Sequence, residues 1–206
     1  RDVLGSRGLG DVYKRQDRPP LNMLKHKHMR AIYTTNEKIK LLARRGIDIY
    51  IEHPFTDEFS HLSPEDFVIK VLLEKTGMKV LVVGDDCGFG YKRQGNVELL
   101  ERMSKEYDFK LIVIPKLELE GEIVSSTRIR HLLSEGKVEE ANRLMEDPFM
   151  ICGSVVHGNH MGAEVLQMPT ANQIPLEDKL LPPNGVYVSR IHYKDETYYG
   201  ISNVGV

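Results

Sequence analysis

Two short runs of branched apolar residues, each ended by a sharp break, constrain the fold of this chain most. Residues 79–84 (KVLVVG) end at a glycine, and residues 111–114 (LIVI) are followed at once by Pro115. Runs of this length and composition are typical of buried strands in a parallel sheet. Residues 97–107 between them have the apolar spacing of a helix. Strands that alternate with helices predict a doubly wound parallel sheet.

The chain before these strands follows the same alternation. Residues 38–43 predict a helix that ends at Gly46, and residues 47–51 (IDIYI) alternate as a strand does. Residues 63–66 (SPED) form a helix start, with a hydroxyl cap, a proline in the first turn and acids near the positive helix end. This part of the chain is therefore predicted to be of the α/β class.

The character of the sequence changes near Asp147-Pro148. Two short helices, separated by Gly136, are predicted before this boundary, and three strands after it, at residues 151–157, 185–193 and 197–203. Residues 194–196 (KDE) fit a hairpin turn between the last two strands. The second part is thus expected to be part of a small antiparallel β-barrel, left open where the sequence stops.

Composition limits the remaining possibilities. The 206 residues are 41% apolar and 28% charged with a net charge of -2, which favours neither a nucleic-acid partner nor a membrane partner. Two cysteines, Cys87 and Cys152, make no disulfide framework or metal cluster, so a cytoplasmic location is expected. Residues 1–16 lack a helical or strand period, and we interpret them as foreign to the natural protein. The expected domains are residues 17–148 and 149–206.

The first candidate site is residues 124–130 (VSSTRIR). Serine hydroxyls open a helix there, where free backbone N–H groups and the helix dipole favour an anion. Arg130 lies one turn into the helix and could reach the same anion with its forked donors. The competing interpretation is a plain helix cap with solvated arginines. The position after the 111–114 strand favours a ligand site, because open α/β sheets bind ligands beyond strand carboxyl ends.

The second candidate site is the loop at residues 84–90 (GDDCGFG), directly after the 79–84 strand. Its glycines allow close approach to the backbone, and Phe89 could stack on a planar ring. A glycine-rich turn with solvated acids explains the loop equally well. The glycine spacing is not that of a dinucleotide fingerprint.

The third candidate site runs from residues 157–158 (HG) to residues 169–172 (PTAN). The Thr170 hydroxyl could bind a magnesium ion that bridges nucleotide phosphates, and the Asn172 amide could orient a substrate. A loop leading into an ordinary strand is the alternative. His157 and His160 have no evident third partner, so we interpret them as surface residues and not metal ligands.

These segments, in this order, resemble the bacterial bifunctional riboflavin kinase/FMN adenylyltransferase family, also called FAD synthetase. The resemblance covers residues 17–206. It rests on segments that together are specific although none is decisive alone: residues 36–42 (NEKIKLL), 54–59, 62–65 (LSPE), 82–90, 124–130, 156–158 (VHG), 169–172 and 185–187 (GVY).

The resemblance implies a Rossmann-like nucleotidylyltransferase domain followed by a β-barrel kinase domain. The barrel would phosphorylate riboflavin with ATP to give FMN, and the α/β domain would transfer AMP from ATP to FMN to give FAD. Both reactions would use Mg²⁺. The ATP phosphates would bind Ser126, Thr127 and Arg130 in the first site, and the flavin would bind Asp86 and Phe89. In the kinase, Gly158 and Thr170 would bind ATP, Thr170 would also hold the metal, and Asn172 would be catalytic.

The sequence also departs from the family pattern. The resemblance implies a His-x-Gly-His turn before residue 17 and a kinase glutamate after residue 206, so we expect this chain to be a piece of the enzyme with impaired activity. Residues 162–168 (GAEVLQM) lack the arginine and second glycine expected before the PTAN segment. Two alternatives stay open: a single-activity nucleotidylyltransferase acting on another phosphate ester, and a non-catalytic flavin- or nucleotide-binding remnant.

Overall fold

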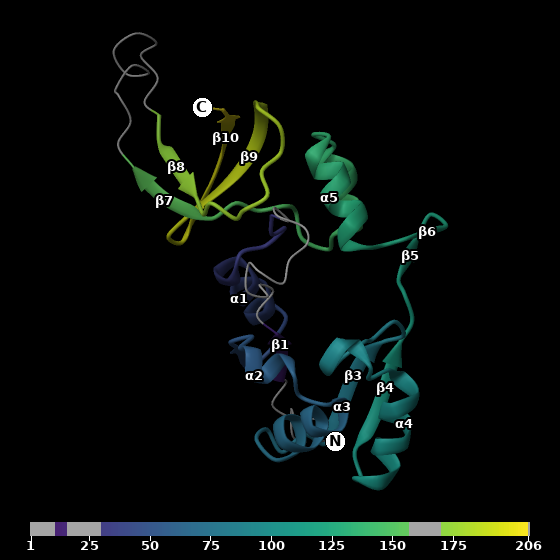
Figure 1. Ribbon diagram of the computed structural model, residues 1–206. Helices are drawn as coiled ribbons and strands as arrows, with labels where there is room; N and C mark the ends of the chain where they lie inside the picture. The colour runs from purple at the N-terminus through teal and green to yellow at the C-terminus, as the bar shows by residue number, and fades with distance from the viewer. Residues whose placement is uncertain (1–10, 16–29, 157–169, 206) are drawn as a thin grey trace, which may run out of the picture. The chain divides into compact units, whose positions relative to one another are not determined.

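The computed structural model describes residues 11–15, 30–156 and 170–205, which form two compact units (Figure 1). Unit 1 contains residues 30–49 together with the described residues from 124 onward. Unit 2 contains residues 11–15 and 50–123. Unit 1 is therefore built from segments that are far apart in the sequence, whereas most of unit 2 is one continuous stretch.

Unit 2 carries the predicted alternation of helices and strands. Its elements are β1 (Asp11–Arg15), β2 (Ile49–His53, whose first residue belongs to unit 1), α2 (Asp57–Ser60), α3 (Pro64–Asp66) with its π-helical continuation (Phe67–Leu73), β3 (Val80–Gly84), a 3-10 turn (Tyr91–Arg93), α4 (Val97–Glu106), β4 (Lys110–Ile114), β5 (Glu118–Leu119) and β6 (Glu122–Ile123). β1 pairs with β2, β3 with β4, and β5 with β6.

Capping residues set the helix starts in unit 2. The Ser63 hydroxyl accepts a hydrogen bond from the backbone N–H of Asp66 with Pro64 in the first turn, which confirms the predicted helix start. The Asn96 side chain caps α4 in the same way, at 2.9 Å from the Leu99 N–H. Such caps satisfy donors that the first helical turn leaves unpaired.

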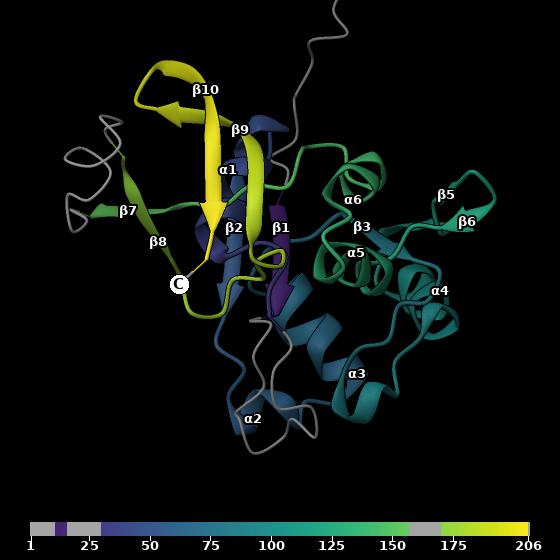
Figure 2. The ribbon, with the colours of Figure 1, turned by 90° about the horizontal axis from the view of Figure 1, so that it is seen from above.

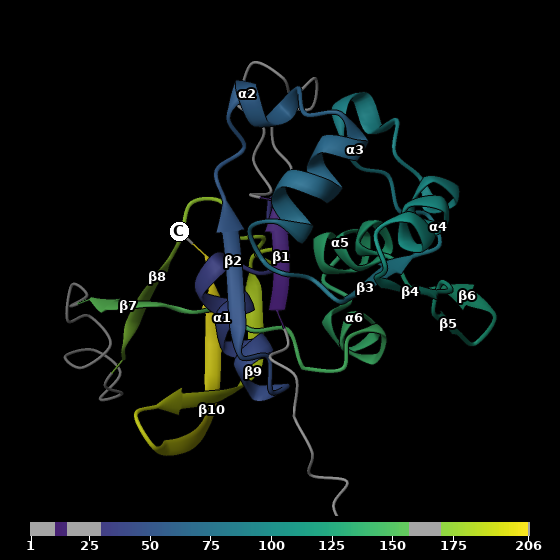
Figure 3. The same cartoon turned by 90° about the horizontal axis from the view of Figure 1, so that it is seen from below.

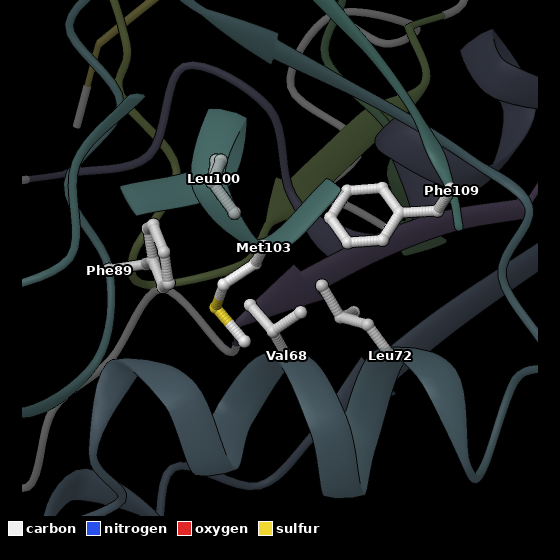
Figure 4. Packing of buried hydrophobic residues seen from close by; sticks show 6 residues of the cluster. All are labelled: Val68, Leu72, Phe89, Leu100, Met103 and Phe109. Atoms are coloured by element: carbon white, nitrogen blue, oxygen red, sulfur yellow. The ribbon is translucent and has the colours of Figure 1, made fainter. Parts of the chain in front are cut away.

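Among the described residues of unit 2, the buried core cluster is apolar (Figure 4). Leu100 and Met103 from α4 meet Val68 of the π-helical segment, and Phe89 and Phe109 close the cluster. β3 and β4 run parallel, with Val80 opposite Lys110 and Gly84 opposite Ile114. Because parallel strands in register end together, the carboxyl ends of β3 and β4 share one edge.

One face of the β3–β4 pair departs from expectation. The sequence predicted strands buried on both faces, but Val80 and Val82 are 50% and 57% exposed. Leu81, Val83 and Leu111 contact the core cluster on the other face. Apolar composition alone cannot distinguish a strand covered on one face from one covered on both. Across the described residues the sheets are two-stranded, so the larger parallel sheet stays a prediction.

Unit 1 combines helices with antiparallel hairpins. Its elements are α1 (Thr35–Arg44), α5 (Ser126–Ser134), α6 (Val138–Leu144), β7 (Gly153–Val156), β8 (Asn172–Pro175), β9 (Gly185–Tyr193) and β10 (Glu196–Val204). Figure 2 shows α5 and α6 side by side, joined at Gly136, whose φ of 78° is the left-handed conformation that ends a helix. Ile129, Leu132 and Leu133 of α5 are buried against Ile32 and Ala141, as the helical spacing predicted.

The strands of unit 1 pair as two hairpins. β9 and β10 are antiparallel, with Tyr193 opposite Glu196 (Figure 3). Lys194 and Asp195 therefore form the turn, and Glu196, predicted as its last residue, begins β10. β7 and β8 are antiparallel, with Val156 opposite Asn172. The class of the chain is therefore mixed α and β with antiparallel sheets, as predicted, while closure of a barrel stays a prediction.

Three strands were not foreseen from the sequence. β1 lies inside residues 1–16, which sequence reasoning set aside because they lack a helical or strand period. β5 and β6 are too short for a period-2 pattern, with Gly121 at φ 78° in their turn. β8, which begins at Asn172, agrees instead with the alternative of a loop that leads into an ordinary strand.

Candidate functional site

The start of α5 is organised as a helix cap. The Ser125 hydroxyl accepts a hydrogen bond from the Arg128 N–H at 3.2 Å, so Ser125 and not Ser126 is the capping residue. Ser126 and Thr127 follow it in the first turn and are exposed. Exposed hydroxyls at a helix start, beside first-turn N–H groups and the positive end of the helix dipole, can stabilise a bound anion.

Arg130 lies one turn into α5 and is half-buried. Its Nε donates to the backbone carbonyl of Arg30 at 3.4 Å. This contact comes from the strip of residues 30–32, whose Ile32 side chain belongs to the same apolar cluster as α5. The strip thus contributes to the placement of Arg130, which sequence reasoning had assigned to the α5 turn alone.

The loop after β3 lies at the shared carboxyl edge of the parallel pair, as predicted. The Asp85 N–H donates to the Ile114 carbonyl at 3.0 Å, and the Asp85 carboxylate accepts from the Lys116 N–H at 3.4 Å. The exposed Asp86 carboxylate lies 3.4 Å from the Lys116 ammonium. The loop is therefore tied to the end of β4, with Asp86 exposed to solvent.

Phe89 occupies a different environment from the rest of the loop. Its ring is buried in the core cluster, and its backbone exchanges two hydrogen bonds with Gly95, at 3.1 and 2.9 Å. An added Cβ at Gly95 would lie 2.7 Å from the Phe89 ring, and one at Gly90, whose φ is 71°, would lie 2.7 Å from Pro64. The glycines therefore allow the loop to approach its own chain, and the buried ring anchors the loop.

Cys87 in the same loop is not poised as a nucleophile. Burial, followed by the neighbouring Asp86 carboxylate, raises the pKa of the Cys87 thiol, and Arg93 opposes this with a smaller effect. A thiol with a raised pKa stays protonated near neutral pH, and the thiol is far less reactive than the thiolate.

The third candidate site is described in part. Thr170 and Asn172 are exposed, with Asn172 the first residue of β8. Gly158, His157 and His160 lie outside the described residues. Over residues 11–15, 30–156 and 170–205, no group of three or more His, Cys, Asp or Glu side chains could hold a metal ion. The hydroxyl and amide oxygens of Thr170 and Asn172 are of the type that Mg²⁺ accepts, together with phosphate oxygens and water.

The predicted site residues fall into both units. Ser126, Thr127 and Arg130 are in unit 1, as are Thr170 and Asn172. Asp86 and Phe89 are in unit 2. Each set lies within its own unit.

Among the helices of the described residues, none is long and apolar enough to cross a membrane.

Sequence reasoning missed a buried ion pair in unit 1. The Lys179 ammonium lies 2.7 Å from Oε2 of Glu37, and the two side chains have no exposed surface. Lys179 also donates to the carbonyls of Ile32 and Met150, at 2.6 and 2.5 Å. The other oxygen of Glu37 accepts from the Cys152 N–H at 2.7 Å. The only local signal was the capping box of Thr34 and Glu37, which does not reveal a partner far along the chain.

Two family models match the chain. The FAD synthetase model matches residues 12–128, and the riboflavin kinase model matches residues 145–206. Unit 1 therefore contains residues from both matched segments, with α1 and the start of α5 from the first and β7–β10 from the second.

Curated relatives agree with these matches. The chain is 40% identical over 190 residues to the bifunctional riboflavin kinase/FMN adenylyltransferase of Buchnera aphidicola subsp. Schizaphis graminum, covering 91% of this chain and 60% of the relative. It is 31% identical over 207 residues to the enzyme of that name from Listeria monocytogenes, covering 100% of this chain and 65% of the relative. The chain thus spans less than two thirds of the length of these relatives.

A solved structure is also similar. A Streptococcus pneumoniae protein described as a macrolide-efflux protein aligns with a TM-score of 0.79 and 30% identity, covering 95% of this chain and 63% of that chain. The resemblance found in the sequence motifs is confirmed by the family matches. The chain belongs to the FAD synthetase family, whose curated relatives are named bifunctional riboflavin kinase/FMN adenylyltransferase.

Proposed function

We propose that the protein containing this chain makes flavin cofactors in two steps, phosphorylation of riboflavin by ATP to FMN and adenylylation of FMN by ATP to FAD. The observation that carries the proposal is the order of the two family matches along one chain. Both reactions transfer a phosphorus group without any need for a covalent enzyme intermediate, so positioning and charge neutralisation would supply most of the catalysis.

In the FAD-forming step, Ser126, Thr127 and Arg130 would hold the ATP phosphates at the α5 N-terminus. The exposed hydroxyls, the first-turn N–H groups and the guanidinium all present donors to an anion. Asp86 would orient the flavin. Phe89 would act through the loop that it anchors. Its ring is buried in the core cluster, so direct contact between the ring and the flavin stays a prediction. A Rossmann-like sheet would carry this site.

In the FMN-forming step, Thr170 and Gly158 would hold ATP, and Asn172 would orient the reacting groups at the start of β8. A magnesium ion held with the Thr170 hydroxyl would neutralise phosphate charge. A closed β-barrel that includes β7–β10 would carry this site.

We infer a cytoplasmic location, supported by the two unpaired cysteines, and no nucleic-acid or membrane partner, supported by the balanced charge.

Separate assays of the two steps test the proposal in the protein of full family length. Arg130→Ala should lower the rate of FAD formation from FMN and ATP by about a hundred-fold, as loss of a charged transition-state contact does, while FMN formation from riboflavin changes little. Asn172→Ala should do the reverse. Arg143→Ala on the exposed side of α6 and Asn203→Ala in β10 are matched controls. Equal loss of both activities in either site variant would contradict the assignment of sites.

A further inference from the structure

The buried Lys179–Glu37 pair connects the two family-matched segments inside unit 1. Glu37 lies in α1, within the FAD synthetase match, and Lys179 follows β8, within the riboflavin kinase match. An ion pair without exposed surface is costly unless its remaining hydrogen-bonding groups are satisfied. Here the Lys179 ammonium has three acceptors, and the Glu37 carboxylate accepts from Lys179, from the Thr34 N–H at 2.8 Å and from the Cys152 N–H.

The strip of residues 30–32 lies between Lys179 and α5. Its Ala31 N–H donates to the Asp178 carbonyl at 2.7 Å, and its Ala31 carbonyl accepts from the Leu180 N–H at 2.9 Å. Lys179 holds the next carbonyl, that of Ile32. The strip is therefore fixed on one side by three consecutive residues of the kinase-matched segment.

On its other side, the same strip contacts α5. The Ile32 side chain is buried with Ile129, Leu132 and Leu133 of α5, and Leu180 packs against this cluster. The Arg30 carbonyl accepts from Nε of Arg130. A continuous set of contacts thus leads from the Lys179 ammonium through residues 30–32 to Arg130.

We propose that Lys179 is a positioning residue for the nucleotide grip of the FAD-forming site: it holds residues 30–32, and these hold α5 and the Arg130 guanidinium. The kinase-matched segment then supplies part of the framework on which the first site stands. Because the Lys179 side chain is fully buried, its effect passes through residues 30–32 to Arg130. This inference rests on the proposed role of Arg130 in ATP binding.

The test is steady-state kinetics of FAD formation from added FMN and ATP in the protein of full family length. Supplying FMN makes the assay independent of the kinase step. Lys179→Met keeps an unbranched side chain only one atom shorter and removes the charge. We expect it to raise the KM for ATP by about ten-fold, because small displacements of a binding group are costly, with a smaller change in kcat. Lys194→Met, at the exposed β9–β10 turn of the same segment, is the control and should change neither constant.

A neutral pair keeps the test informative if Lys179→Met folds poorly. The double variant Glu37→Gln with Lys179→Met removes the stranded charge and should recover the fold, while the Ile32 and Met150 carbonyls still lack their donor. We expect its KM for ATP to stay above that of the wild type and its Ala31 and Cys152 amides to exchange hydrogen faster. A wild-type KM for ATP in either folded variant would overturn the inference. If the unaltered protein formed no FAD, the proposed function itself would fail, which is a separate result.

Discussion

The interiors of the two units are stabilised in different ways. The core of unit 2 is a cluster of apolar side chains such as Val68, Leu100 and Met103, drawn from elements close in sequence (Figure 4). Unit 1 also has an apolar cluster around Leu133, but beside it lies a fully buried ion pair between distant segments. Apolar packing tolerates substitution of one apolar residue by another of similar size, whereas a buried charge requires its specific partner. The fold of unit 1 therefore depends on one pairing in a way that the fold of unit 2 does not.

The surroundings of Lys179 sharpen this difference. Burial lowers the pKa of the Lys179 ammonium, and the hydrogen bond to Glu37 opposes this with a smaller effect. The ammonium also lies 4.4 Å from the centre of the Phe149 ring and 5.5 Å from that of Tyr33, where ring faces attract a cation. These contacts thus compensate the Lys179 ammonium for the hydration that it loses on burial.

The largest effect on stability is expected when one charge of the Lys179–Glu37 pair is left buried without its partner. Lys179→Met should lower the free energy of unfolding of unit 1 by about 3–5 kcal/mol, because Glu37 stays buried without its cation. Hydrogen exchange measured at the amides of α5 and α1 would report unit 1, and the amides of β3 and β4 would report unit 2. Equal loss of protection in both units would break the comparison.

An intermediate effect is expected from a cavity in unit 2. Leu100→Ala should destabilise unit 2 by about 3 kcal/mol, the cost of lost burial and of the space left behind. The same exchange measurement should now show the loss at β3, β4 and α4. Glu101→Ala, the exposed neighbour on α4, serves as control and should have little effect. A larger loss than that of Lys179→Met would reverse the proposed order.

The smallest effects are expected at helix starts, where the two units are alike. Ser125→Ala in α5 and Asn96→Ala in α4 each remove one capping hydrogen bond, and each should cost about 1 kcal/mol. Exchange of the first-turn amides of each helix measures both in one experiment. A difference of several kcal/mol between the two variants would show that one cap has a role beyond its helix.

Much of this fold follows from short-range signals. The cap at Ser63, the break at Gly136 and the turn at Lys194-Asp195 are set by residues adjacent in sequence, and the structure confirms them. The position of the 84–90 loop beyond the β3–β4 edge follows equally directly, because parallel strands that alternate with helices end together.

Other features depend on residues far apart, which periodicity does not register. Phe89 has the pattern of an exposed ring in a glycine-rich loop, and its burial depends on space left by Gly95. Lys179 and Glu37 are charged residues that composition assigns to the surface, and each is buried only because the other is present. For the candidate site, the sequence indicated Ser126, Thr127 and Arg130 but not the backbone strip beside them.

The discontinuous make-up of unit 1 has a consequence for synthesis of the protein on the ribosome. Glu37 and Lys179 are 142 positions apart, and residues 50–123 of unit 2 are made between them. At translation rates of about 5–20 residues per second, α1 emerges on the order of ten seconds before its buried partner exists. During that interval unit 2 can complete its core, while the Glu37 carboxylate remains hydrated. Unit 1 therefore completes its fold late, only after Lys179 has been synthesised.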